Sequence, residues 1–180
     1  MSNIPTSCVA PAVGDRIFAA DAERLARQLD AGRGLAQITE LVHEIAMQYQ
    51  PTAVGAIGHI DVYPNSRNVI PGKVVFTVDF RSPILDSLTK MENEFYQRAP
   101  GICEELGLTF EHKISGQFDP PEFDKNCVAA VRNAADRLGY SHRDIVSGAG
   151  HDACWINQVA PTAMVMCPCV DGLSHHEAED

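Results

Sequence analysis

The residues with the clearest potential for chemistry lie between Gly55 and Pro83. Apolar and polar residues alternate on both sides of a turn-rich middle, a pattern that predicts two strands joined by a loop. One face of this strand pair would carry His59, Asp61, Asp79 and Arg81. Charged groups in such an arrangement form either cross-strand ion pairs on a solvated surface or a site for a charged ligand.

The loop between the two strands favours the second alternative. Residues 64–68, with the sequence PNSRN, are rich in amide and guanidinium donors. We expect Arg81 to lie at a strand end beside this loop. Such a concentration of donors is more than a solvated sheet face requires.

Two further motifs lie near the C-terminus. The segment Ser147–Ala153, with the sequence SGAGHDA, is a glycine turn that leads into a short helix. Backbone N–H groups at such a turn can hold a carboxylate or an oxyanion, although the motif alone predicts only a turn. The segment 172–179, with the sequence GLSHHEAE, is by itself a polar tail with two adjacent histidines.

The motifs PNSRNVIPG and VDFR resemble the lid, or dimerisation, domain of dinuclear-metal amidohydrolases related to aminoacylases and carboxypeptidases. Together with SGAGHDA, PTAM and DGLSHHEAE, they make residues 35–180 most similar to the N-carbamoyl-L-amino-acid hydrolases, beta-ureidopropionases and allantoate amidohydrolases. The resemblance implies that Asn68 and Arg81 clamp a substrate carboxylate, a task suited to the rigid guanidinium fork. It also implies that the Gly150 amide contacts this carboxylate and that His175 is a metal ligand. It assigns no role to His151.

Complete relatives are expected to hold two divalent ions of zinc, manganese or cobalt. Their remaining ligands and their glutamate base come from His-x-Asp and Glu-Glu motifs in N-terminal segments, and the family's His-Ala-Gly turn is not found within residues 1–34. The only Glu-Glu pair, Glu104–Glu105, lies late on a predicted helix. We therefore expect no catalytic residue and no tightly bound metal in this chain, because a catalytic metal needs three or more protein ligands.

These observations lead to two hypotheses about function. The first is a fragment or truncated relative of an amidohydrolase of N-carbamoyl amino acids or ureido compounds, which supplies carboxylate recognition and homodimer contacts. The alternative is a non-catalytic dimerisation or binding module that keeps the lid fold.

The surrounding elements predict an α+β fold. We expect an open-faced antiparallel sheet with two helices. Its elements are a helix over 35–49, the two strands already described, a helix from 83 to 106 that is interrupted at Pro100, and a strand over 108–115. Because residues 16–29 have helical spacing, this ferredoxin-like lid domain, 35–117, would lack its first strand. Its unpaired edge would need a partner.

The flanking segments are less complete. Residues 1–34 remain unassigned, and the double proline at 120–121 marks a linker. Residues 118–180 contain an expected helix and an apolar strand over 161–167, which are parts of an incomplete α/β catalytic domain.

Composition limits the partners and the compartment. A formal net charge of −10 disfavours nucleic acid and anionic membranes, and no apolar run reaches a membrane-spanning length. The N-terminus has no signal-peptide pattern, which predicts a cytoplasmic protein. The six cysteines fit buried, reduced thiols better than a zinc site, because Cys167 and Cys169 form the only close pair.

Overall fold

The computed structural model describes residues 15–24, 30–172 and 177, with backbone alone for the first segment and for residue 170. The chain divides into two compact units. The first comprises Met1–Pro121 and Val146–His151, and the second comprises Glu122–Ile145 and Asp152–Asp180.

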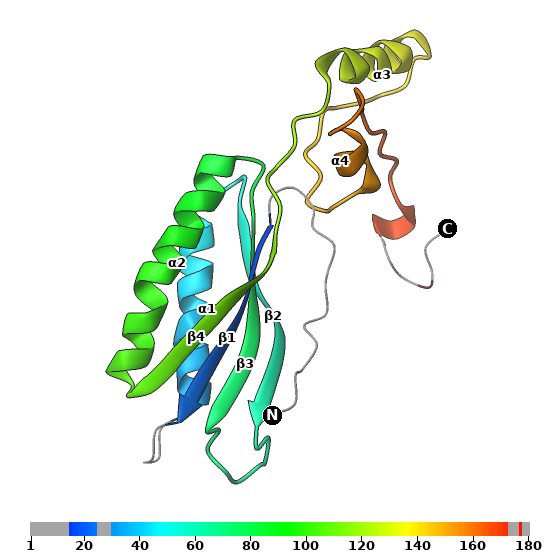
Figure 1. Cartoon of the computed structure of the whole chain (residues 1–180). Helices are drawn as coiled ribbons and strands as arrows, with labels where there is room; N and C mark the ends of the chain where they lie inside the picture. Colours follow the sequence, from blue (N-terminus) through cyan, green and yellow to red (C-terminus); the bar gives the residue numbers. More distant parts are fainter. Residues whose placement is uncertain (1–14, 25–29, 173–176, 178–180) are drawn as a thin grey trace. The chain divides into compact units, whose positions relative to one another are not determined.

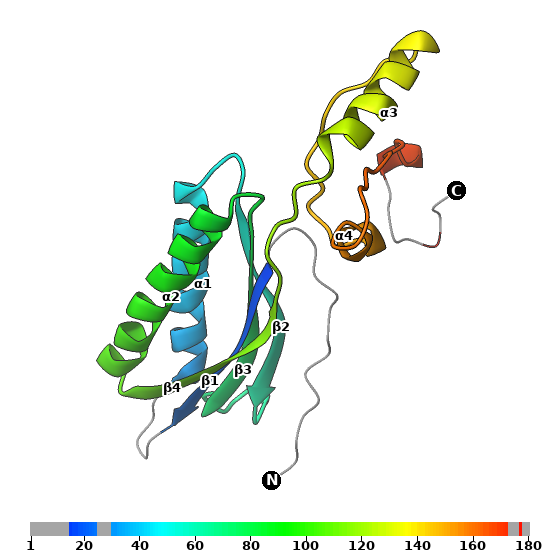
Figure 2. The ribbon, with the colours of Figure 1, turned by 45° about the horizontal axis from the view of Figure 1, so that its top comes forward.

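The first unit is an open-faced α+β sandwich, as the sequence predicts. Its elements are β1 (Asp15–Arg24), α1 (Ala31–Gln48), β2 (Val54–Tyr63), β3 (Lys73–Arg81), α2 (Leu85–Glu105) and β4 (Leu108–Gln117). The strands form an antiparallel sheet in the order β2-β3-β1-β4. Both helices lie side by side on one face of this sheet (Figures 1 and 2). The order of elements and strands is that of the ferredoxin-like fold.

The prediction that the sheet lacks its first strand is wrong. Residues 15–24 form β1 rather than the beginning of a helix, and β1 lies in the middle of the sheet between β3 and β4. Ala20, for example, pairs with Phe76 on one side and with His112 on the other. This alanine-rich segment forms a strand despite its helical spacing, because it pairs with two other strands, β3 and β4. Such pairing within the folded protein outweighs the intrinsic helix propensity of the residues.

The two helices of this unit confirm the predicted pattern with changed boundaries. Helix α1 begins four residues before the predicted start, since the Asp30 carboxylate accepts hydrogen bonds from the backbone N–H groups of Gly32 and Arg33. Helix α2 continues through Pro100, where an interruption was expected. Ala99 and Cys103, on either side of this proline, are both fully buried, so packing on the sheet holds the two segments in one helix.

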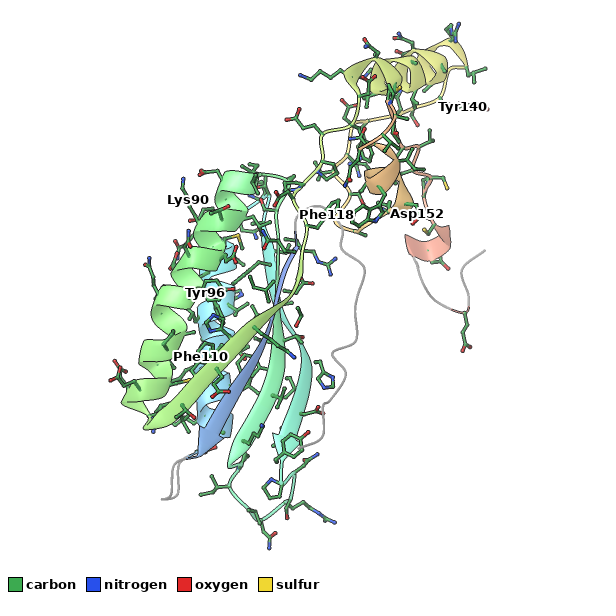
Figure 3. All side chains as sticks on the ribbon, viewed as in Figure 1. Lys90, Tyr96, Phe110, Phe118, Tyr140 and Asp152 are labelled. Carbon is green, nitrogen blue, oxygen red and sulfur yellow. The ribbon has the colours of Figure 1, made fainter. Side chains whose placement is uncertain are left out.

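The core lies between the sheet and the two helices. Strand β3 alternates fully buried and partly exposed residues, in agreement with the prediction. The largest buried side chains are Phe76, Phe80, Phe95, Ile38, Ile45, Leu88 and Met91. The Phe95 ring lies 6.0 Å from that of Phe80 and 6.2 Å from those of Tyr96 and Phe110, in edge-to-face contacts. Tyr96 and Phe110 lie where α2 covers β4 (Figure 3).

Strand β2 departs from the predicted alternation at a bulge. Ile57 pairs with Val78 and Ile60 with Phe76, so two residues of β2 stand opposite Thr77 alone. The bulge shifts the alternation between the two halves of β2: Gly55 and Ile57 pair with Phe80 and Val78 before it, whereas Ile60 and Val62 pair with Phe76 and Val74 after it. In the half before the bulge, Val54 lies opposite Arg81 and is exposed.

The second unit contains α3 (Lys125–Arg137), α4 (Asp152–Ile156) and a short 3-10 turn, η1 (Val170–Gly172). The Asp124 carboxylate caps α3 by accepting hydrogen bonds from the backbone N–H groups of Cys127 and Asn126, and these bonds lower its pKa. No residue of α3 is fully buried. The expected strand over 161–167 is absent from this described segment, because a strand needs a partner in the ladder.

The described cysteines agree in part with the expectation of buried thiols. Cys103 and Cys154 are buried, and burial raises the pKa of the Cys103 thiol to about 11. Cys167 is exposed. In the described part of the chain, no helix combines the length and the apolar character that crossing a membrane demands.

Candidate carboxylate-binding site

Arg81 is held by an aspartate on its own strand. Its Nε and Nη2 atoms donate to Oδ2 of Asp79 at 3.0 Å and 2.6 Å. Residues two apart on a strand share a face, so this pairing follows from the alternation of β3. The ion pair is therefore within one strand, whereas the sequence suggested pairs across strands. His59 and Asp61 repeat the arrangement on β2, with Nε2 and Oδ2 2.8 Å apart.

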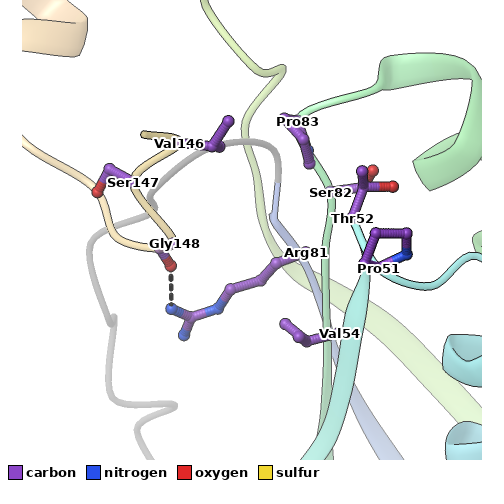
Figure 4. A pocket seen from close by; sticks show the side chains of 9 residues that line it. All are labelled: Pro51, Thr52, Val54, Arg81, Ser82, Pro83, Val146, Ser147 and Gly148. Atoms are coloured by element: carbon purple, nitrogen blue, oxygen red, sulfur yellow. Dashed lines mark hydrogen bonds between the residues drawn. The ribbon is translucent and has the colours of Figure 1, made fainter. Parts of the chain in front are cut away.

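The remaining end of the Arg81 guanidinium points to the glycine loop of the first unit. Its Nη1 donates to the Gly148 carbonyl oxygen at 2.9 Å (Figure 4). The motif SGAGH, residues 147–151, therefore lies beside Arg81, although Ser147 follows Arg81 by 66 positions in the sequence. The structure thus brings together two elements that the sequence analysis connected only through the family resemblance.

A small pocket of about 250 Å³ lies next to this contact. Its apolar wall is made by Pro51, Val54, Pro83 and Val146, and its polar groups belong to Thr52, Arg81, Ser82, Ser147 and Gly148 (Figure 4). A concave apolar surface with a few convergent polar groups is the usual form of a small-molecule site. The Nη1 group of Arg81 offers a charged hydrogen-bond donor beside this pocket, while the Asp79 carboxylate offsets the charge of the guanidinium.

Asn68 lies far from Arg81, and the expectation that Arg81 stands beside the loop 64–68 is wrong. That loop joins β2 to the beginning of β3, whereas Arg81 ends β3 (Figure 1). A strand of nine residues separates them, and at about 3.3 Å per residue they lie more than about 25 Å apart. Asn68 accepts through Oδ1 from the Ser66 hydroxyl at 3.0 Å. One chain therefore cannot apply both side chains to the same carboxylate.

Gly150 and His151 lie in the same loop as Gly148. The Nε2 atom of His151 is 2.6 Å from the Ser147 hydroxyl oxygen, a contact that the sequence analysis did not identify. His175, the residue that resemblance identifies as a metal ligand, lies outside the described residues. Across the described part of the chain, no three His, Cys, Asp or Glu side chains form a group that could bind a metal ion.

The sequence placed Asp79 on the same face as Arg81, as expected for residues two apart on a strand, but it did not predict that these two side chains pair with each other. The Gly148 carbonyl carried no such signal, since backbone atoms are common to every residue. Asp79 is also notable for its Oδ1 atom, which is buried without a hydrogen-bond partner among the described residues.

The chain is similar to known proteins over most of its length. Residues 5–180 match the peptidase family M20/M25/M40. The chain is 56% identical to an N-carbamoyl-L-amino-acid amidohydrolase of Rhizobium meliloti over 153 residues, which cover 85% of this chain and 37% of that protein. It is 31% identical to an allantoate amidohydrolase of Escherichia coli (strain K12) over 122 residues, covering 68% and 30% of the two chains.

The chain is also similar to a solved structure. A hydantoinase/carbamoylase family amidase from Burkholderia vietnamiensis superposes with a TM-score of 0.85 and 45% identity. The superposition covers 95% of this chain and 44% of that one. The chain thus spans less than half the length of each of these three proteins.

Proposed function

Because this chain belongs to the peptidase family M20/M25/M40, we propose that it is the carboxylate-recognising part of an amidohydrolase. Its substrates would be N-carbamoyl amino acids or related ureido compounds, in line with the names of its relatives. The chain would supply the lid and the C-terminal part of the catalytic domain. The scattered, partly buried cysteines favour a reducing compartment, which agrees with a cytoplasmic location.

The observation that carries this proposal is the contact between Arg81 and the glycine loop. Asp79 binds the Nε and Nη2 edge of the guanidinium and so fixes its plane. The Gly148 oxygen marks the direction in which Nη1 donates. A substrate carboxylate would replace this oxygen as the acceptor, while the amide of Gly150 in the same loop supplies a further donor.

Binding of N-carbamoyl-L-alanine to the purified chain tests the proposal. Arg81→Lys keeps the charge but loses the fork, and hydrogen bonds to charged groups contribute about 1.5–3 kcal/mol. We therefore expect the Kd, followed by NMR shift titration, to rise about 10- to 150-fold.

Arg98→Lys is the matched control, because Arg98 binds Glu44 and Glu94 on the helices, away from the pocket. This control should leave the Kd unchanged. A second control is the derivative of N-carbamoyl-L-alanine in which a carboxamide replaces the carboxylate. The native chain should bind this derivative as weakly as the Arg81→Lys variant binds N-carbamoyl-L-alanine itself. If the native chain and Arg81→Lys bind N-carbamoyl-L-alanine with equal affinity, Arg81 is a residue of a solvated sheet face and not part of a carboxylate site.

We propose further that the functional form is a homodimer. Although β1 fills the sheet, β2 remains an edge strand with exposed Val54, Ile60 and Tyr63. If β2 pairs in antiparallel orientation with β2 of a second copy, the beginning of β2 in one copy lies beside the end of β2 in the other. The loop that carries Asn68 in one copy would then lie beside the Arg81 end of the other, because Val54 is opposite Arg81.

A lysine on the β2 edge should disrupt such a dimer. Ile60→Lys places two like charges near the two-fold axis, and we expect the dimer Kd from sedimentation equilibrium to rise at least about tenfold. Ile114→Lys is the control, since Ile114 is 50% exposed on the other edge strand, β4, compared with 46% for Ile60. A native chain that remains monomeric at micromolar concentration would contradict the dimer.

The two divalent metal ions of complete relatives do not fit the described residues, which offer no group of three ligands. We therefore propose that zinc, manganese or cobalt is not tightly bound by this chain alone, and that His175 contributes a single ligand to a site completed elsewhere. The alternative function, a non-catalytic dimerisation or binding module, has one observation in its favour. The first unit has a continuous core of its own, made from both helices and the sheet.

A further inference from the structure

The hydroxyl group of Ser147 lies at the centre of the glycine loop. Its Oγ atom accepts from the N–H of Ala149 at 3.2 Å, lies 3.3 Å from the Ala149 carbonyl oxygen and lies 2.6 Å from Nε2 of His151. A serine hydroxyl has one proton to donate, so it can donate either to His151 or to the Ala149 carbonyl. The choice determines which nitrogen of a neutral His151 carries the proton.

The distances favour donation to His151. An N–H···O hydrogen bond is usually about 2.9–3.0 Å long and rarely shorter than about 2.7 Å, whereas a hydroxyl group that donates to oxygen forms bonds of about 2.7–2.8 Å. The contact of 2.6 Å therefore fits a hydroxyl donor better than an imidazole donor. The 3.3 Å contact with the Ala149 carbonyl is the weaker competitor. With its proton directed at Nε2, the hydroxyl keeps a lone pair for the Ala149 N–H.

We propose that Ser147 is a positioning residue that holds neutral His151 in the tautomer protonated at Nδ1. In this tautomer Nε2 is occupied as an acceptor, and Nδ1–H is the group left to meet a ligand. His151 can then donate to a ligand but cannot accept from one. The histidine thus selects for an oxygen acceptor, such as a carbonyl or carboxylate oxygen, and against an amine or ammonium group.

The loop combines this donor with the anion site. Gly148, between Ser147 and His151, presents its carbonyl oxygen to Arg81 at 2.9 Å. Two cross-connections, one through a hydroxyl group and one through a guanidinium, therefore fix a loop of five residues. The ligand preference of His151 rests on the function proposed above, because it requires a ligand at Arg81. The tautomer does not depend on that function.

The test is the tautomer of His151 in the full chain, measured by long-range proton–nitrogen correlation NMR on histidine-labelled protein at alkaline pH. The chain has seven histidines, and His151→Gln identifies the signals of interest. We expect the protonated nitrogen to be Nδ1 in the native chain and to shift to Nε2 in Ser147→Ala. Ser147→Thr, which keeps the hydroxyl group, should restore Nδ1 protonation.

Ser66→Ala is the matched control, because Ser66 also donates to a side chain in a loop of the first unit. It should leave His151 unchanged, and unaltered signals of the other histidines report that each variant is folded. Nε2 protonation in the native chain, or the same tautomer in the native chain and in Ser147→Ala, would overturn the proposal. A final titration with N-carbamoyl-L-alanine should shift the Nδ1–H signal. If the tautomer depends on Ser147 but the compound does not bind the chain at all, the proposed function is wrong and the tautomer assignment stands. Binding without a shift of the Nδ1–H signal would overturn the ligand preference of His151.

Discussion

Phe95→Ala is expected to lower the free energy of unfolding of the first unit by about 3–5 kcal/mol. The Phe95 side chain is fully buried on α2 and contacts the rings of Phe80, Tyr96 and Phe110. Removal of the ring loses its transfer free energy and leaves a cavity between helix and sheet, which neighbouring rings fill only in part. The measurement is urea unfolding followed by far-ultraviolet circular dichroism, with the slope compared between variants.

Leu85→Ala provides the control on the same helix. Leu85 is 44% exposed at the beginning of α2, so its truncation removes little buried surface. We expect a change within about 0.5 kcal/mol, as for other surface substitutions. A loss below about 1 kcal/mol for Phe95→Ala would mean that the ring is not part of a packed core.

The elements that the sequence predicted well are those with many regularly spaced apolar residues. In β3, Val74, Phe76, Val78 and Phe80 alternate with partly exposed residues, and all four are fully buried. Helix α2 keeps its apolar stripe over 21 residues, including the turn that contains Pro100. A strong pattern over a long segment outweighs a single unfavourable residue, because the buried face contributes more than local propensity.

One element that the sequence predicted wrongly is β1, and the reason is its position in the sheet. A central strand is held by hydrogen bonds to β3 and β4, which lie far away in the sequence. Nothing in the local spacing of residues 15–24 reports this pairing. The bulge in β2 is a similar case, since the extra residue opposite Thr77 depends on β3 rather than on β2 alone.

The sequence named residues of the candidate site but did not predict how they are arranged. The sequence indicated Arg81 and the glycine loop separately, and the structure joins them through the Gly148 carbonyl. It also separates Asn68 from Arg81 by the length of β3. An alternating pattern defines which residues share a face. It does not define how far apart two residues lie along the strand. That distance follows from the chain direction, which places the loop 64–68 at the beginning of β3 and Arg81 at its end.

The absence of turnover by the chain alone is the second prediction with a large effect. After dialysis, we expect the purified chain to retain far less than one equivalent of zinc, manganese or cobalt. We also expect it to release no ammonia from N-carbamoyl amino acids when these ions are added. Only His175 is assigned to the metal site, whereas catalytic sites use three or more protein ligands, and water attack needs a general base as well. Metal analysis and an ammonia assay measure both quantities.

A chimera distinguishes two reasons why the chain alone would be inactive, namely that it lacks the other metal ligands or that it is misfolded. This chain aligns over 153 residues with the N-carbamoyl-L-amino-acid amidohydrolase of Rhizobium meliloti at 56% identity, and these residues make up 37% of that protein. Replacing them with the matching residues of this chain should give a protein that binds metal and releases ammonia, because the remainder supplies the other ligands and the base. In this chimera, His175→Ala should reduce both metal content and turnover, and Arg81→Lys should reduce substrate binding while the metal stays bound. Stoichiometric metal and turnover in the chain alone would contradict the fragment hypothesis. An inactive, folded chimera would instead favour the non-catalytic module, since the lid would then lack the contacts that a complete enzyme requires.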